Sequence, residues 1–191
     1  MRKNIPIATL AILALSAIIQ VLNLIGEPTS SWLYSNFNIT GWDILYSQPW
    51  RMITSSFLHA NFLHYLGNMS TLLLVGWRLE QKLGPAKFLG AFFGGMLTAY
   101  VLWVTGQHGW LVGISGGVCG IFGLSLIANR QEPWWKTIVA DPIHLFYLVF
   151  LAVPFLPFFE PWVGFTVANL VHLFGIIYGI LFGLAFLAAS K

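Results

Sequence analysis

Long apolar stretches alternate with short polar ones along most of the chain, and this pattern predicts membrane-spanning helices. A transmembrane helix needs about 20 predominantly apolar residues. The first such stretch, IPIATLAILALSAIIQVLNLI, covers residues 5–25. Further candidate spans lie at 62–79, 88–104, 115–128, 143–159 and 164–188. The pattern therefore predicts an all-α bundle of six transmembrane helices.

Two segments do not fit a simple helix-and-loop pattern. Residues 26–58 are too polar to span a membrane but are rich in tryptophan and tyrosine, which favour the lipid headgroup layer. We expect a structured first loop lying in the interface. The fourth span is short and glycine-rich, and TGQHGWLVG at 105–113 precedes it. Non-helical backbone at membrane depth is tolerated where it is buried or lines a cavity, so we expect a cavity there.

Composition supports an integral membrane protein. Of the 191 residues, 58% are hydrophobic and only 8% are charged, whereas a soluble domain carries about 25% charged residues. One compact membrane domain over residues 1–191 accounts for the length. The single cysteine, Cys119, excludes an internal disulfide, and the chain has neither a zinc-type Cys/His cluster nor a basic run. We therefore expect no metal, no cofactor and no nucleic-acid partner.

The positive charges predict the orientation. In the six-span topology, Arg51 alone falls on one side, and the other eight Lys and Arg residues fall on the opposite side. These eight are Arg2, Lys3, Arg78, Lys82, Lys87, Arg130, Lys136 and Lys191. By the positive-inside rule, both termini are cytoplasmic, and the fourth helix starts from the outer side at Ser115.

Four polar side chains fall in the outer half of this bundle. His64 and Asn68 share one face of the second span, Ser115 begins the fourth, and His172 lies about 12 Å into the sixth. Serine and histidine together permit nucleophilic catalysis, with the imidazole removing the hydroxyl proton. Free N–H groups at a helix start, together with His64 and Asn68, can stabilise an oxyanion. We predict a Ser-His dyad, because no carboxylate is suitably placed to complete a triad.

Glycines are spaced to bring the two helices of this dyad together. His172 is followed by glycines at every fourth position, and the fourth span is also rich in glycine. Such small-residue faces let membrane helices approach backbone to backbone. The glycines are Gly175, Gly179 and Gly183 on the sixth span, and Gly116, Gly117, Gly120 and Gly123 on the fourth.

The same motifs resemble those of the rhomboid family of intramembrane serine proteases. GISG at 113–116 is similar to the family's G-x-S-G, and NLVHLFGIIYG at 169–179 to its last-helix motif. HANFLHYLGN at 59–68 resembles the second-helix signature. PWR at 49–51 and EQKLG at 80–84 are similar to further family motifs.

The resemblance implies a role for each site residue. Ser115 is implied as nucleophile, His172 as base, and His64 and Asn68 as oxyanion stabilisers. His59 is implied as a structural histidine. In one departure, Cys119 stands where the family usually has an aromatic ring on which the base histidine stacks, with Phe122 following one turn later.

The resemblance also implies an activity, namely hydrolysis of peptide bonds in or near the membrane segment of single-span proteins within the lipid bilayer. We expect a bacterial inner membrane, with the active site opening toward the outer side. Two alternatives are a non-catalytic relative that binds client helices and a relative specialised on C-terminal sorting tails. Glu80 and Gly84 favour the ordinary protease over the tail-specific relative. A metal-dependent protease fits poorly because the H-E-x-x-H motif is absent.

Overall fold

The computed structural model describes residues 5–41, 46–106, 110–128, 145 and 168–189. Within these residues every regular element is helical, and there is one isolated antiparallel bridge between Ile39 and Leu111. The predicted span 143–159 lies outside the described residues, apart from Leu145.

Three helices in the described part of the chain are long and apolar enough to cross a membrane. They are α1 (Ile7–Leu24), α7 (Pro85–Gly106) and α12 (Asn169–Ala189). A fourth apolar helix, α8 (Ser115–Ile127), is shorter. These helices coincide with four of the predicted spans, because in each case one long apolar run forms one helix.

The second predicted span is a composite helix. It consists of α5 (Phe62–Thr71), the π-helical segment η2 (Leu72–Gly76) and α6 (Trp77–Leu83). The side chain of Asn61 caps its start by accepting a hydrogen bond from the backbone N–H of His64 at 2.9 Å. The helix continues past the predicted end at residue 79 and stops at Gly84, whose positive φ of 84° suits glycine at a helix end.

A buried carboxylate joins α6 to the start of α1. Glu80 accepts hydrogen bonds from the backbone N–H groups of Ala8 (3.0 Å) and Thr9 (2.7 Å), and from the hydroxyl of Thr9 (2.7 Å). The first N–H groups of a helix lack intrahelical partners and lie at the positive end of its dipole. Pro6, at the N-cap position of α1, provides no side-chain cap. Glu80 supplies the cap from another helix.

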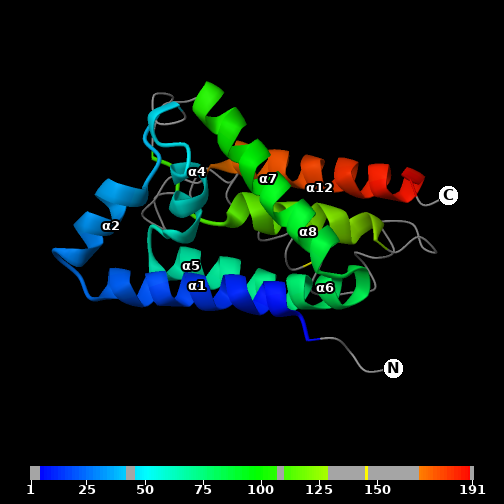
Figure 1. Ribbon diagram of the computed structural model, residues 1–191, viewed down its shortest axis with the longest axis horizontal. Helices are drawn as coiled ribbons and strands as arrows, with labels where there is room; N and C mark the ends of the chain where they lie inside the picture. Colours follow the sequence, from blue (N-terminus) through cyan, green and yellow to red (C-terminus); the bar gives the residue numbers. More distant parts are fainter. Residues whose placement is uncertain (1–4, 42–45, 107–109, 129–144, 146–167, 190–191) are drawn as a thin grey trace.

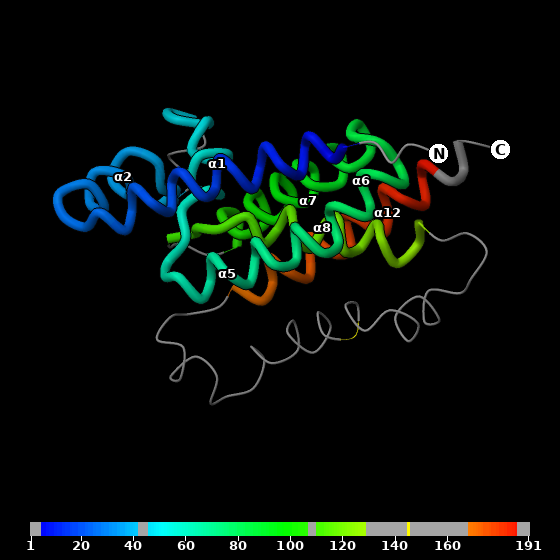
Figure 2. The backbone as a smooth tube through the Cα atoms, turned by 90° about the horizontal axis from the view of Figure 1, so that it is seen from below, coloured from blue at the N-terminus to red at the C-terminus, as the bar shows by residue number. Residues whose placement is uncertain are grey.

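The central helix of the bundle is α8. It lies between α7 and α12, while α1 runs beside η2 and α6 (Figures 1 and 2). All its residues from Gly116 to Leu126 are buried. The start of α1 and the end of α12 lie at the same end of the molecule (Figure 1). The start of α7 meets the end of α12 there, because the ammonium of Lys87 lies 3.9 Å from the ring centroid of Phe186.

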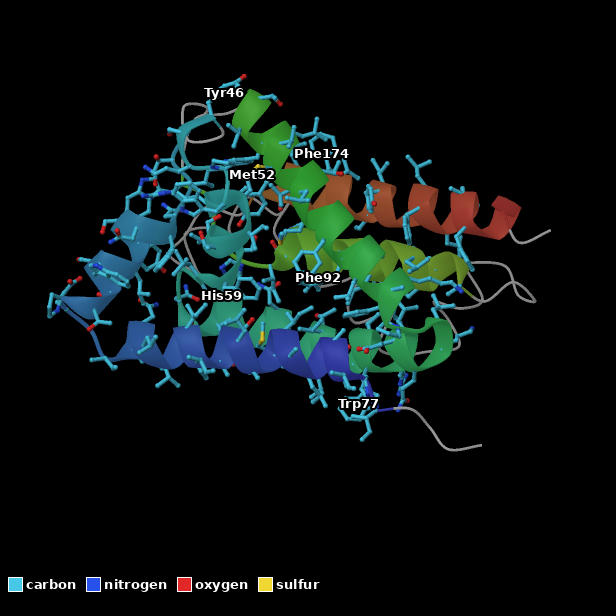
Figure 3. The ribbon with its side chains drawn as sticks, in the orientation of Figure 1. Tyr46, Met52, His59, Trp77, Phe92 and Phe174 are labelled. Atoms are coloured by element: carbon cyan, nitrogen blue, oxygen red, sulfur yellow. The ribbon has the colours of Figure 1, made fainter. Side chains whose placement is uncertain are left out.

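The predicted first loop contains short helices at the opposite end of the molecule (Figure 1). They are α2 (Thr29–Phe37), α4 (Arg51–Thr54) and the 3₁₀ turn η1 (Ser55–Phe57). Arg51 donates hydrogen bonds to the carbonyl of Asn38 (2.8 Å) and to Oε1 of Gln48 (2.6 Å), so it holds this region together. Trp32, Tyr46 and Trp50 are more than half exposed, and Figure 3 shows Tyr46 at the periphery.

Candidate active site

The helices α8 and α12 pack in direct backbone contact. A Cβ atom added to Gly175 would overlap the carbonyl oxygen of Gly116, and one added to Gly179 would overlap the carbonyl oxygen of Gly120. The pairing advances by one turn on both helices together, so the helices run parallel. Only glycine permits so close an approach, as the small-residue faces predicted.

This register places Ser115 and His172 at the same level. Val171 packs against the start of α8, because its Cγ1 lies 3.5 Å from the position that a Cβ of Gly116 would occupy. Ser115 precedes Gly116 in the chain, and His172 follows Val171. His172 also lies one turn before Gly175, on the face of α12 that is turned toward α8.

Two features distinguish the surroundings of His172. Its Nδ1 is buried and has no hydrogen-bond partner within the described residues. Cys119 is fully buried beside the next turn of α12, and its Cβ lies 2.8 Å from the position that a Cβ of Gly175 would take. The residue at the family's usual aromatic position therefore packs at the contact between α8 and α12.

Gly113 lies beneath the two side chains predicted to stabilise an oxyanion. A Cβ on Gly113 would lie 2.6 Å from Cε1 and 2.8 Å from Nε2 of His64, and 3.7 Å from Nδ2 of Asn68. Its φ of +102° lies in the left-handed region that favours glycine. His64 and Asn68 thus lie beside the backbone two residues before Ser115.

The backbone of Gly113 is held on both sides. Its N–H donates to the carbonyl of Ser55 at 3.3 Å, and its carbonyl accepts from the buried hydroxyl of Tyr100 at 3.4 Å. Just before it, the N–H of Leu111 donates to the carbonyl of Ile39 at 3.4 Å. Sequence analysis did not single out Ser55 or Tyr100. A sequence signal existed for Tyr100, because it lies inside a predicted span and a buried tyrosine hydroxyl needs a hydrogen-bond partner.

His59 packs beneath the ring of His64. Their ring centroids lie 5.2 Å apart with the rings edge to face, and the ring of Tyr65 lies 5.5 Å from His59 on another side. Figure 3 shows His59 where the chain enters α5. Burial, with a smaller effect from His64, lowers the pKa of His59 to about 3. The ring is therefore neutral at physiological pH.

These observations define a class of protein, an all-helical integral membrane protein with polar groups gathered at the start of a buried central helix. Ser115 and His172 come from α8 and α12, while His64 and Asn68 come from α5. Comparison with known proteins identifies the family. The model of the Rhomboid domain matches residues 46–189.

Named relatives agree with the family match. The chain is 30% identical over 192 residues to "Putative rhomboid protease YdcA" of Bacillus subtilis (strain 168), covering 97% of this chain and 90% of the relative. It is 25% identical to "Rhomboid protease GlpG" of Salmonella paratyphi A, covering 92% of this chain and 61% of the relative. It is 34% identical to "RHOMBOID-like protein 1" of Arabidopsis thaliana, covering 73% of this chain and 35% of the relative. The chain belongs to the rhomboid family.

Proposed function

We propose that this protein is an intramembrane serine protease in which Ser115 is the nucleophile and His172 the general base. The relatives named as rhomboid proteases support the activity. The observation that carries the assignment of residues is the backbone contact between α8 and α12, because it brings Ser115 and His172 to one level. The buried Nδ1 of His172, without a partner in the described part of the chain, favours a dyad.

The proposed reaction has two steps. Oγ of Ser115 attacks the carbonyl carbon of the substrate while His172 takes the hydroxyl proton. The C–N bond then breaks, and His172 gives the proton to the leaving amine. Water hydrolyses the resulting ester by the same route, with His172 again acting as base.

The negative charge of each tetrahedral intermediate falls on the former carbonyl oxygen. The first N–H groups of α8 have no intrahelical partners, so they can donate to that oxygen. His64 and Asn68 are the proposed side-chain donors, since both lie at Gly113, just before the helix begins. Removing one donor of this kind costs about 100-fold or more in rate.

The proposal extends to the membrane setting. We propose that residues 1–191 form one membrane domain with both termini cytoplasmic, as the distribution of Lys and Arg predicts. The site then opens toward the outer side of a bacterial inner membrane. Single-span membrane proteins are the proposed substrates, and the chemistry requires no cofactor. Reporter fusions at both ends, read for cytoplasmic or external activity, test the orientation.

The experiment for the nucleophile compares two serines of the same helix. Purified wild type, Ser115→Ala and Ser125→Ala are placed in liposomes with a single-span substrate, and cleavage is followed by mass spectrometry. Ser125 is a matched control, because it lies in α8 and its hydroxyl donates to the carbonyl of Phe122 at 2.6 Å. We expect Ser125→Ala to cleave and Ser115→Ala to be inactive.

A fluorophosphonate probe makes the test independent of substrate choice. It should label wild type and Ser125→Ala but neither Ser115→Ala nor His172→Ala. Labelling or cleavage by Ser115→Ala would overturn the assignment of the nucleophile. Absence of both labelling and cleavage in folded wild type would support the non-catalytic alternative.

A further inference from the structure

Tyr34 of α2 connects three segments that are distant in sequence. Its hydroxyl donates to the carbonyl of His59 at 2.7 Å, and its ring stacks on Trp110 with centroids 6.0 Å apart and planes inclined by 24°. The side chain of Asn23, near the end of α1, also hydrogen-bonds to Tyr34. Burial raises the pKa of Tyr34 more than that hydrogen bond lowers it, so the hydroxyl stays protonated and can donate.

The two main contacts of Tyr34 lead to opposite sides of the candidate oxyanion site. On one side, the ring of His59 packs against the ring of His64. On the other side, Trp110 begins the described segment that passes through Gly113 to Ser115. These two sides meet where His64 packs over Gly113.

We propose that Tyr34 is a positioning residue that fixes the oxyanion donors relative to the nucleophile by holding His59 and Trp110 at a set separation. The inference rests on the proposed protease function and deepens it. Tyr34 acts through other residues and does not touch the reacting atoms.

The start of the segment before Ser115 has the least other support. Trp110 is 68% exposed, so neighbouring side chains cover little of it, and the bridge between Leu111 and Ile39 is a single long hydrogen bond of 3.4 Å, whereas Gly113 is bonded by Ser55 and Tyr100. The stack with Tyr34 therefore restrains the segment at its start. Small displacements of catalytic groups cost large factors in rate, so loss of this restraint should appear in the chemical step.

The test measures acylation directly. The rate constant for inactivation by a fluorophosphonate is determined in detergent micelles for wild type, Tyr34→Phe, Tyr34→Leu, Trp110→Leu and the double variant Tyr34→Leu/Trp110→Leu. Trp32→Leu is the matched control, because Trp32 lies on α2 and is 56% exposed, and its ring contact is with Phe37. Thermal unfolding and KM for a single-span substrate are measured alongside.

We expect Tyr34→Leu and Trp110→Leu each to lower the inactivation rate and kcat by about 10-fold, with Tm and KM nearly unchanged. The double variant should be no slower than the worse single variant, because both substitutions remove the same stack. Tyr34→Phe keeps the ring and loses only the hydroxyl, so it should fall between wild type and Tyr34→Leu. Trp32→Leu should match wild type.

Three results would overturn the inference. The first is a wild-type rate in all Tyr34 and Trp110 variants. The second is a loss of rate that only accompanies a lower Tm, or that occurs equally in Trp32→Leu, because it would show a structural role alone. The third is full additivity in the double variant. Failure of the proposed function is distinguishable, because folded wild type would then not react with the probe.

Discussion

Gly175 of α12 lies against the carbonyl oxygen of Gly116 in α8, with no room for a methyl group between the two backbones. This contact sets the register of the two helices that carry His172 and Ser115. A residue larger than glycine at position 175 must push α12 away from α8, and the displacement includes the preceding turn, which carries His172. The spacing between the proposed base and nucleophile thus depends on having glycine, which has no side chain, at position 175.

We predict that Gly175→Ala lowers kcat by at least about 10-fold and destabilises the fold by about 1–3 kcal/mol, the usual cost of overpacking. Cleavage kinetics and thermal unfolding of the purified protein measure the two effects. Gly106→Ala is the control, because a Cβ there would meet nothing within 4 Å in the part of the chain that the structure describes. Wild-type kcat in Gly175→Ala would show that the register of α12 does not position His172.

Gly113 is needed for two reasons, its positive φ and the close approach of the His64 ring, and a comparison with Gly84 separates them. Gly113→Ala must both accommodate a positive φ and displace the ring of His64, whereas Gly84 has a positive φ of 84° with open space around it. We predict that Gly84→Ala loses about 1–3 kcal/mol of stability through backbone strain alone, because a φ of 84° with a ψ of 163° is a conformation that almost only glycine adopts. Gly113→Ala should lose at least as much stability and also lower kcat by about 100-fold, because the oxyanion donors move.

Thermal unfolding and initial cleavage rates are measured for Gly113→Ala and Gly84→Ala. A Gly113→Ala protein with the kcat of Gly84→Ala would mean that His64 is not required at its present position.

The buried cap on α1 predicts a stability effect away from the site. Glu80→Gln leaves one side-chain oxygen to accept the three hydrogen bonds that the two carboxylate oxygens accept in wild type. It also removes the negative charge at the positive end of the helix dipole. We expect a loss of about 2 kcal/mol, typical for hydrogen bonds to a charged group, with kcat retained at low temperature. Glu27→Gln is the control, because Glu27 is exposed and, among the described residues, its hydrogen bonds are to the nearby serines Ser30 and Ser31. Equal Tm values for the two variants would contradict the prediction.

The fold was predictable from sequence where one apolar run forms one helix. Residues 5–25 and 88–104 appear as α1 and α7 with ends shifted by one to three residues. The second span was predicted only in part, because hydropathy does not register a π-helical segment or the helix end at Gly84. The same segment also approaches α7 closely, because a Cβ added to Gly76 would lie 3.1 Å from Cε2 of Phe88, and no local sequence pattern encodes this approach.

In the candidate site, too, some features could be predicted from the sequence pattern, and others depend on contacts between distant segments. That Ser115, His172, His64 and Asn68 gather in one region was predictable because polar residues within the predicted spans are few, and the glycine stripes indicated which helices meet. The residues that hold Gly113 were not predictable. Ser55 and Tyr100 reach it from elements distant in sequence, and Ser55 acts through its backbone carbonyl, which has no sequence signature.

The buried ring of His59 predicts how stability depends on pH. Because the folded-state pKa is about 3 and an unfolded histidine has a pKa of about 6.5, the unfolded chain binds the extra proton first as the pH falls. The stability associated with the neutral ring is therefore complete above pH 6.5 and is lost as the pH falls from there toward 3. Between pH 7 and pH 5 this loss amounts to about 2 kcal/mol.

His59→Phe tests this dependence, because phenylalanine has a similar shape and does not titrate. A hydrogen bond to the backbone of Phe57, the smallest influence on the pKa of His59, is lost in the variant. Tyr34, by contrast, bonds the backbone carbonyl of His59, which the variant retains. We expect the variant to be about 1 kcal/mol less stable than wild type at pH 7, the worth of one hydrogen bond, and to lose about 2 kcal/mol less on going to pH 5. Thermal unfolding in detergent across this range measures the difference. Parallel pH curves for the two proteins would show that His59 does not stay neutral in the folded state.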